Sequence, residues 1–294
     1  MYLCIRNNKN KKDMIKQFTT YLRNIKGYSQ NTADAYEADL REFAKYMAAA
    51  HRGAKWSTIK QADILEFLSN QATRGLKPAT TNRQLSAIRA IYNYFISQDM
   101  LKTNPARYIP SRKIEQTEPN TIAISDLEKA YKKAEGALHT ALGLLLETGI
   151  RIQELLDIRK YDIRENGRIV INGKGAKQRI VVTSPEVSDE LREMCKNKRP
   201  EQLIFGGYYY CQRELRHDIW ELLRQTGSHC KQASPHAIRH TFATEIAKQG
   251  ENVITLAKML GHNNIRTTQR YIDTAQTETA TAFHRYQTSL AIGG

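Results

Sequence analysis

The first 110 residues place apolar side chains at helical spacing in four successive stretches. This pattern predicts helices over residues 14–26, 31–46, 62–72 and 78–98. Asn31 and Thr32 are residues that commonly cap a helix, and Pro78 suits a first helical turn. The pair Asn104-Pro105 ends the pattern, and the polar stretch after it, which contains proline, is typical of a linker. We therefore expect a helical N-terminal domain over residues 1–109 and a linker over residues 110–121.

Beyond the linker the pattern predicts a capped helix start at residues 124–128 and helices over residues 137–147 and 151–158. Two β-branched runs, 168–171 and 178–183, flank a Gly-Lys-Gly turn and predict a hairpin. Helices resume at Pro185, Ser234-Pro235 is a strong helix start, and a last helix is expected over residues 277–290. The fold class is therefore mainly α, in two domains, with a small β-sheet in a second domain over residues 122–294.

The charge of the chain adds a polyanionic partner to this picture. The sequence has 45 Lys and Arg against 30 Asp and Glu, a net charge of +15. Residues 1–110 alone hold 18 against 8, a net of +10. A surface this basic indicates a polyanionic partner, with much of the grip in the N-terminal domain. The alternative is a basic surface that binds no partner.

The remaining composition limits where the protein acts. No apolar run reaches the length of a membrane span, and the N-terminus lacks the apolar core of a secretory signal. The four cysteines are scattered without a CxxC spacing, which is typical of reduced thiols. We therefore expect a cytoplasmic protein with no membrane partner.

Candidate chemistry lies in an ordered set of residues in the second domain: Arg151, Lys174, His236, Arg239, His262 and Tyr271. Arginines can neutralise phosphate oxygens, lysine and histidine can move protons, and a tyrosine hydroxyl can attack phosphorus. These groups together are sufficient to break a phosphodiester bond without a metal. We expect no cofactor, and a zinc site on Cys230, His236 and His240 is disfavoured because no fourth ligand lies at a suitable spacing.

The flanks of these residues carry a family resemblance. Arg151 follows the Gly149 turn, Lys174 stands between two glycines, and Tyr271 comes nine positions after the Leu-Gly-His that ends at His262. His236 and Arg239 belong to the run Ser-Pro-His-Ala-Ile-Arg-His-Thr-Phe-Ala-Thr. The order, spacing and flanks resemble the tyrosine site-specific recombinases, also called the phage integrase family, and among them the small two-domain Xer-like members. The resemblance extends from about Met14 to about Tyr286.

The resemblance implies a recombinase that cleaves and rejoins DNA through a 3′-phosphotyrosyl intermediate and exchanges strands through a Holliday junction. It also implies a homotetramer on two DNA sites, monomeric off DNA. Lys174 matches the family position of the general acid, and Lys177 is the alternative. Two other functions stay open, a type IB topoisomerase and a catalytically inert DNA-binding protein. The purpose of recombination also stays open between integration and excision, inversion and dimer resolution.

Supporting residues complete the expected site. Glu154 and His240 are expected to orient their neighbours within it. Candidate DNA contacts lie on or beside the fourth helix, around the hairpin and on a later helix: Lys77, Thr80, Thr81, Asn82, Arg83, Arg89, Lys177, Arg179, Arg213 and Arg216.

Overall fold

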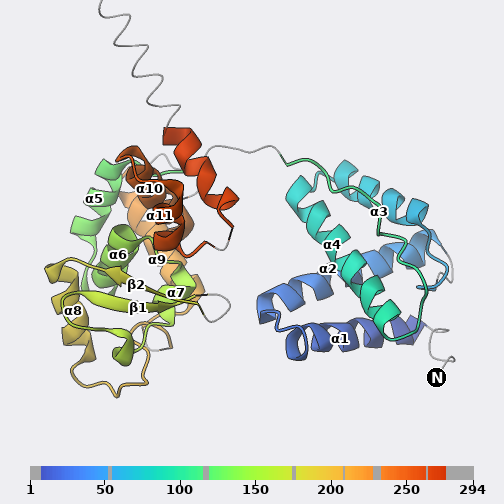
Figure 1. The fold of residues 1–294 in the computed structure, drawn as a ribbon, viewed down its shortest axis with the longest axis horizontal. Coiled ribbons are helices and arrows are strands. Elements are labelled where there is room, and N and C mark those ends of the chain that lie inside the picture. The colour runs from blue at the N-terminus through green and yellow to red at the C-terminus, as the bar shows by residue number, and fades with distance from the viewer. Residues whose placement is uncertain are drawn as a thin grey trace, which may run out of the picture. The chain divides into compact units, whose positions relative to one another are not determined.

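The chain forms two compact units (Figure 1). The computed structural model describes residues 8–51, 55–114, 119–173, 177–207, 209–227, 233–262 and 264–275. The units are Met1–Gln116 and Thr117–Gly294, so the division falls inside the stretch predicted as a linker. The domain limits at residues 109 and 122 stay predictions.

Four helices make up the described part of the first unit: α1 (Asn8–Asn24), α2 (Gln30–Ala50), α3 (Gln61–Thr73) and α4 (Pro78–Ser97). Pro78 occupies the first turn of α4, as its fixed φ predicts. The predicted cap of α2 is wrong. Asn31 and Thr32 lie inside the helix, and the hydroxyl of Ser29 accepts the Thr32 amide at 3.3 Å instead.

An aromatic core joins these helices. Phe43 of α2, Phe67 of α3 and Phe95 of α4 are fully buried, and Trp56 packs on Phe43 and Phe95. The buried Tyr92 hydroxyl donates to the Trp56 carbonyl at 3.0 Å, so its polar end is satisfied. The apolar face of each predicted helix is therefore used in one shared core.

The second unit is built around α6 (Gly136–Thr148), in which residues 141–145 are all buried. A helix that is apolar on every side must be surrounded by other elements. The elements that pack on it are α5 (Ile124–Lys133), α7 (Ile152–Leu156), α8 (Pro185–Cys195), α9 (Gln212–Gln225), α10 (Pro235–Lys248) and strand β2 (Gln178–Val182). The helix start predicted at residues 124–128 is present, but Ala123 stands at its N-cap and gives no side-chain cap.

The predicted hairpin is present and forms a two-stranded antiparallel sheet. Strands β1 (Arg168–Asn172) and β2 (Gln178–Val182) pair with Arg168 opposite Val182 and Asn172 opposite Gln178. A 3₁₀ turn, η2 (Lys160–Asp162), precedes β1. The mainly α fold class with a small sheet is thus confirmed.

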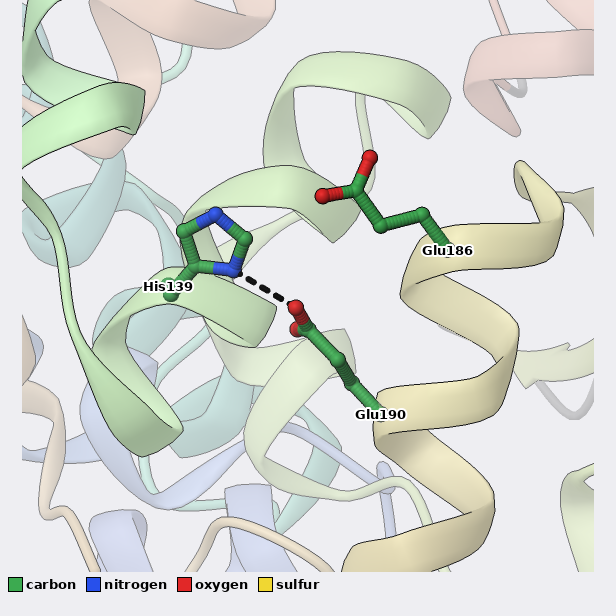
Figure 2. Close-up of side chains that lie close together, drawn as sticks. All are labelled: His139, Glu186 and Glu190. Atoms are coloured by element: carbon green, nitrogen blue, oxygen red, sulfur yellow. Dashed lines mark ion pairs between the residues drawn. The ribbon is translucent and has the colours of Figure 1, made fainter.

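A cluster of acidic groups and a histidine connects α6 to α8 (Figure 2). The His139 Nδ1 atom lies 2.8 Å from a Glu190 oxygen, and Glu186 stands close to both. The Thr140 hydroxyl donates to the other Glu190 oxygen at 2.7 Å, and the Tyr131 ring stacks on His139 at 4.1 Å. His139 and Thr140 of α6 both pair with Glu190 of α8, so these contacts tie the two helices together.

The C-terminal part of the second unit packs α11 (Val253–Leu260) and a helical segment, residues 266–275, against α10. The Ser234 hydroxyl accepts the Ala237 amide at 3.2 Å, so the predicted start of α10 is confirmed. Leu256, Leu260 and Tyr271 lie in one buried cluster. The helix predicted over residues 277–290 lies outside the described residues. Within the described ranges, every helix is too short or too polar to cross a bilayer.

Candidate active site

The turn that presents Arg151 depends on Gly149. This glycine ends α6 with φ at 58°, in the left-handed region. A β-carbon at Gly149 would also come within 2.4 Å of the Phe242 ring on α10. The turn therefore requires glycine, and it makes Arg151 the N-cap residue of α7.

Glu154 holds two arginines at once. One carboxylate oxygen accepts the Arg151 amide at 2.8 Å and the Arg179 Nη2 at 2.7 Å. The other accepts the Arg151 Nη1 at 2.7 Å and the Arg179 Nη1 at 3.1 Å. Burial alone would raise the pKa of Glu154, but the hydrogen bonds from Arg179 and from the Arg151 amide outweigh it and lower the pKa to about 2. Glu154 is therefore ionised at every physiological pH.

Arg239 is buried although it is charged. It is 2% exposed, and its Nη1 donates to the Gly149 carbonyl and its Nη2 to the Leu260 carbonyl, both at 2.6 Å. Burial, and then the charge of Arg151, lower the pKa of Arg239 to about 10. The side chain stays cationic at neutral pH, so the site keeps a buried positive charge beside Arg151.

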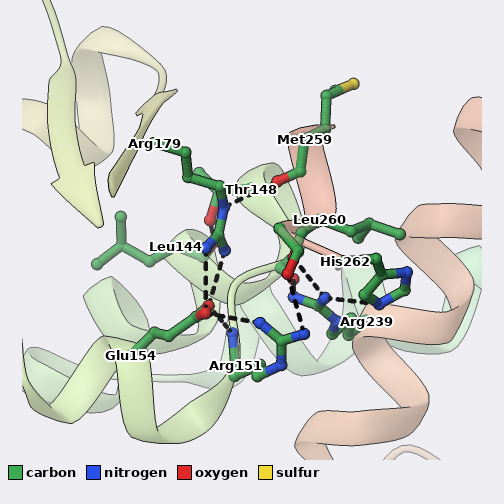
Figure 3. Close-up of polar contacts among 11 residues, drawn as sticks. Leu144, Thr148, Arg151, Glu154, Arg179, Arg239, Met259, Leu260 and His262 are labelled. Carbon is green, nitrogen blue, oxygen red and sulfur yellow. Dashed lines mark hydrogen bonds and ion pairs between the residues drawn. The ribbon is translucent and has the colours of Figure 1, made fainter. Parts of the chain in front are cut away.

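The carboxyl end of α11 gathers three arginines (Figure 3). Each of three successive carbonyl oxygens accepts one guanidinium: Met259 from Arg179 at 2.9 Å, Leu260 from Arg239 at 2.6 Å and Gly261 from Arg151 at 3.4 Å. The last carbonyls of a helix have no partner within the helix and carry its negative dipole end. This helix end therefore organises the cations of the site before any ligand is present.

His262 follows this helix end directly. Its Nε2 lies 3.1 Å from the Arg239 Nη2, and its Nδ1 lies 2.8 Å from the Thr268 hydroxyl oxygen. Burial, and then Arg239, lower the pKa of His262 to about 4, so the ring is neutral at pH 7. Because Arg239 can only donate, Nε2 accepts, and we assign the proton to Nδ1.

Tyr271 is buried against α10. It is 2% exposed, and its hydroxyl oxygen lies 2.5 Å from His240 Nδ1. The Arg270 guanidinium stands 5.0 Å from the Tyr271 ring centroid. Burial raises the pKa of Tyr271, while Arg270 and Arg239 act in the opposite direction. The phenol is therefore neutral at rest and donates a hydrogen bond to the imidazole.

A cavity of about 460 Å³ opens beside these residues, lined among others by Arg151, Arg216, His236 and Arg239. His236 is exposed, and its ring meets the His240 ring edge to face at 4.6 Å. Partial desolvation, and then the charge of Arg239, lower the pKa of His236. Three cations and a histidine around one cavity form a suitable site for a phosphate group.

The two lysine candidates have different standing. Lys174 lies in residues 174–176, outside the described residues. Lys177 is exposed and lines a second cavity of about 500 Å³ together with Arg179, Lys258 and His262. Of the six predicted catalytic residues, the described structure thus brings five into one region.

Arg179 was expected to contact DNA, and the structure gives it an internal role instead. Its side chain is 12% exposed, and its donors are directed to Glu154 and to the Met259 carbonyl. The charge of Arg179 is therefore matched inside the protein. It is a supporting residue of the site that the strand pattern did not distinguish from a solvated arginine.

Three of the expected DNA contacts on α4 also have internal partners. Thr81 is 2% exposed and donates to the Pro78 carbonyl. The Asn82 amide group exchanges two hydrogen bonds of 2.8 Å with the Arg112 backbone, and Arg89 donates to the carbonyls of Ala106 and Ile109. These contacts fold the segment after α4 back onto it.

The other expected contacts face solvent to a greater degree. Lys77, Arg213 and Arg216 are exposed, and Thr80 is half-buried. Arg83 is exposed but pairs with the buried Asp39 at 3.0 Å. The DNA-binding role of this group stays a prediction.

The chain matches known families along most of its length. Residues 120–278 match the phage integrase family, and residues 15–99 match the N-terminal SAM-like domain of phage integrases. Tyrosine recombinase XerD of Oceanobacillus iheyensis is 28% identical over 274 residues, which cover 87% of this chain and 92% of that protein. Tyrosine recombinase XerC of Staphylococcus aureus is 28% identical over 270 residues, which cover 86% and 89%.

Solved structures agree in fold. The post-cleavage complex of XerH site-specific recombinase bound to palindromic difH substrate has a TM-score of 0.73 at 21% identity, over 98% of this chain and 91% of that one. The matches to the two family models confirm the resemblance seen in the sequence. Because the catalytic family model alone spans more than half of the chain, the protein belongs to the phage integrase family.

Proposed function

We propose that this protein is a site-specific DNA recombinase that cleaves and rejoins DNA through a covalent bond between Tyr271 and a 3′ phosphate. The observation that carries the proposal is the position of the Tyr271 hydroxyl. It contacts His240, whose ring meets that of His236. His236 and Arg239 line a cavity with the charge to hold a phosphodiester. The similarity to tyrosine recombinases XerD and XerC supports the same reaction.

Each predicted catalytic residue has a role in this chemistry. Arg151 and Arg239 bind the non-bridging oxygens of the scissile phosphate and stabilise the charge that grows on them in the transition state. His236 lines the same cavity, and His262 accepts a hydrogen bond from Arg239 through Nε2. Storing the bond energy as a phosphotyrosine makes the step reversible without ATP.

The leaving 5′-oxygen needs a proton, and we propose that a lysine supplies it. Lys174 matches the family position, and Lys177 borders the second cavity. Since these residues supply both proton transfer and charge stabilisation, we expect cleavage to need no divalent metal.

The partner is duplex DNA, gripped in part by the basic first unit. By family resemblance we propose a tetramer on two recombining sites, exchange through a Holliday junction and a monomer off DNA. XerH was solved bound to its difH substrate, which supports a DNA site as the ligand here. We place this activity in the cytoplasm, where the DNA substrate lies.

The test is covalent capture. The protein is incubated with sheared DNA from its host, denatured with SDS, and the DNA attached to protein is sequenced. We expect an adduct at a discrete site for the wild type and for Tyr161→Phe, which alters an exposed tyrosine of the same unit. Tyr271→Phe should bind the recovered site yet form no adduct.

An adduct with Tyr271→Phe would remove the nucleophile assignment. A second assay separates recombination from relaxation alone. Two duplexes that carry the recovered site should yield exchanged strands. Relaxation of supercoiled plasmid without exchanged products would instead indicate a topoisomerase.

A further inference from the structure

His240 meets the candidate nucleophile directly. It lies on α10, one residue after Arg239 and one helical turn after His236. Its Nδ1 lies 2.5 Å from the Tyr271 hydroxyl oxygen, at the short end of the range for such a contact. The imidazole is therefore the basic group that stands at the phenolic proton.

The position of Arg270 leaves Nδ1 free to accept. Its Nη2 lies 3.1 Å from Nδ1 and 3.0 Å from Nε2 of His240. The Cε1 atom lies between the two ring nitrogens, so a group almost equidistant from both stands over the ring face. Arg270 thus acts on His240 mainly through its charge. We assign Nδ1 as the acceptor toward the Tyr271 hydroxyl, which lies 2.5 Å away.

Charged and titratable groups surround the His240 ring from three elements. Arg239 and His236 face it from α10, Arg270 from the segment 266–275, and His262 from the end of α11. Burial, and then the charge of Arg270, lower the pKa of His240 to about 3. At neutral pH the ring is therefore an uncharged acceptor, and Tyr271 is the donor.

A bound phosphodiester changes this balance. The carboxylate of Glu154 is already paired with Arg151 and Arg179. Among the described residues, Arg239 and Arg270 form no ion pair with a carboxylate. A phosphate in the cavity lined by Arg151, His236 and Arg239 adds the missing negative charge. An anion favours the protonated form of a nearby imidazole, so His240 becomes a stronger base when substrate binds.

We propose that His240 is a catalytic residue whose Nδ1 accepts the phenolic proton of Tyr271 as the hydroxyl oxygen attacks the scissile phosphorus. The proposal rests on the proposed function. The O–H bond of Tyr271 breaks and an N–H bond forms on His240, while the oxygen bonds to phosphorus. The bond from phosphorus to the 5′-oxygen breaks, and that oxygen takes a proton from the lysine. Religation runs the same transfers in reverse, so His240 returns the proton.

His236 does not have this position. It is exposed at the cavity, and its ring meets the His240 ring. Its place beside Arg151 and Arg239 suits the phosphate. On α10, His240 thus acts on the nucleophile and His236 on the phosphate.

The experiment measures single-turnover cleavage of a nicked suicide duplex that carries the recovered site, as a function of pH. His240→Asn keeps an oxygen acceptor of similar reach but no base. Because general-base catalysis contributes about 10²–10⁴-fold, we expect cleavage at neutral pH to slow at least about 100-fold. The rate should then rise about tenfold per pH unit, because hydroxide must take the proton. His51→Asn, in the first unit, is the matched control and should cleave normally.

A second readout replaces Tyr271 with a ring-fluorinated tyrosine, whose hydroxyl is more acidic. It should restore much of the rate that His240→Asn loses, measured against the same fluorinated tyrosine with His240 intact, while DNA binding stays constant. If His240→Asn fails to fold, His240→Gln carries the same comparison. Cleavage by the variant at the wild-type rate, or a loss that neither pH nor fluorination recovers, overturns the proposal. A wild type that forms no adduct overturns the proposed function itself.

Discussion

Removing the charge of Glu154 should destabilise the second unit strongly. Glu154→Gln keeps the size of the side chain but leaves Arg151 and Arg179 without a counter-charge. The pKa of Glu154 is about 2 against an ordinary value of 4.5, and each unit corresponds to about 1.4 kcal/mol. We therefore expect a loss of about 3 kcal/mol in the free energy of unfolding, the lower end of the ~3–5 kcal/mol typical of breaking a buried ion pair.

The assay uses the chain's two tryptophans, Trp56 in the first unit and Trp220 in the second. Urea unfolding is followed by circular dichroism, which reports the helices of both units. Trp56 fluorescence in a Trp220→Phe background reports the first unit alone. Glu154→Gln should shift the transition of the second unit to lower urea and leave the Trp56 transition in place.

Glu193→Gln is the matched control. Glu193 pairs with Lys196 at the same three-residue spacing, but both side chains are about two-thirds exposed. An exposed pair contributes about 0–1 kcal/mol. Equal losses for Glu154→Gln and Glu193→Gln would refute the reasoning, as would a loss below about 1 kcal/mol for Glu154→Gln. The stabilisation that ionised Glu154 gives the folded second unit is fully present above about pH 4.5 and is lost as the pH falls toward about 2.

Three further predictions concern pH, the leaving group and salt. The pKa of His240 is lowered to about 3 and that of His262 to about 4, from an ordinary value of 6.5. As pH falls, both histidines are therefore protonated in the unfolded chain before they are protonated in the folded one. Thermal melts should show the second unit losing stability as pH falls from about 6.5 to about 4, and a flat profile would contradict this. Lys174→Ala should slow cleavage of a normal phosphate far more than cleavage at a 5′-bridging sulfur, because a thiolate leaves without a proton. If the 5′-bridging sulfur restores cleavage by Lys177→Ala instead, Lys177 is the general acid. DNA binding should weaken with salt, with a log–log slope near −5 if about six phosphates are neutralised. Chloride titrations by anisotropy on the full chain measure it, and a slope near zero would refute the electrostatic grip.

Local pattern explains why most elements could be predicted from the sequence. The helices and the hairpin follow from apolar spacing and from turn residues that lie within a few positions of each other. Ser234 and Pro235 predict the start of α10 because capping is a local interaction. The exceptions lie at helix ends. Helix α1 begins six residues before the predicted start, and α2 ends four residues beyond the predicted end and is capped by Ser29.

Contacts across long sequence separations could not be predicted in this way. Arg179 on β2 looks like a solvated arginine in the sequence, but it meets Glu154, 25 residues away, and Met259, 80 residues away. The contact of His240 with Tyr271 spans 31 residues. Such partners depend on how α10, α11 and the hairpin pack, which no spacing rule encodes.

The carbonyl oxygens at the end of α11 have a consequence for affinity. A flexible arginine loses about 0.5–1.5 kcal/mol of rotamer freedom when a ligand immobilises it. Arg151 and Arg239 are already fixed by Glu154 and by the carbonyls of Gly261 and Leu260. That entropy is therefore lost when the chain folds, not when DNA arrives. For two side chains this entropy is about 2 kcal/mol. It corresponds to a Kd for DNA roughly thirtyfold lower than that of a site with freely rotating arginines.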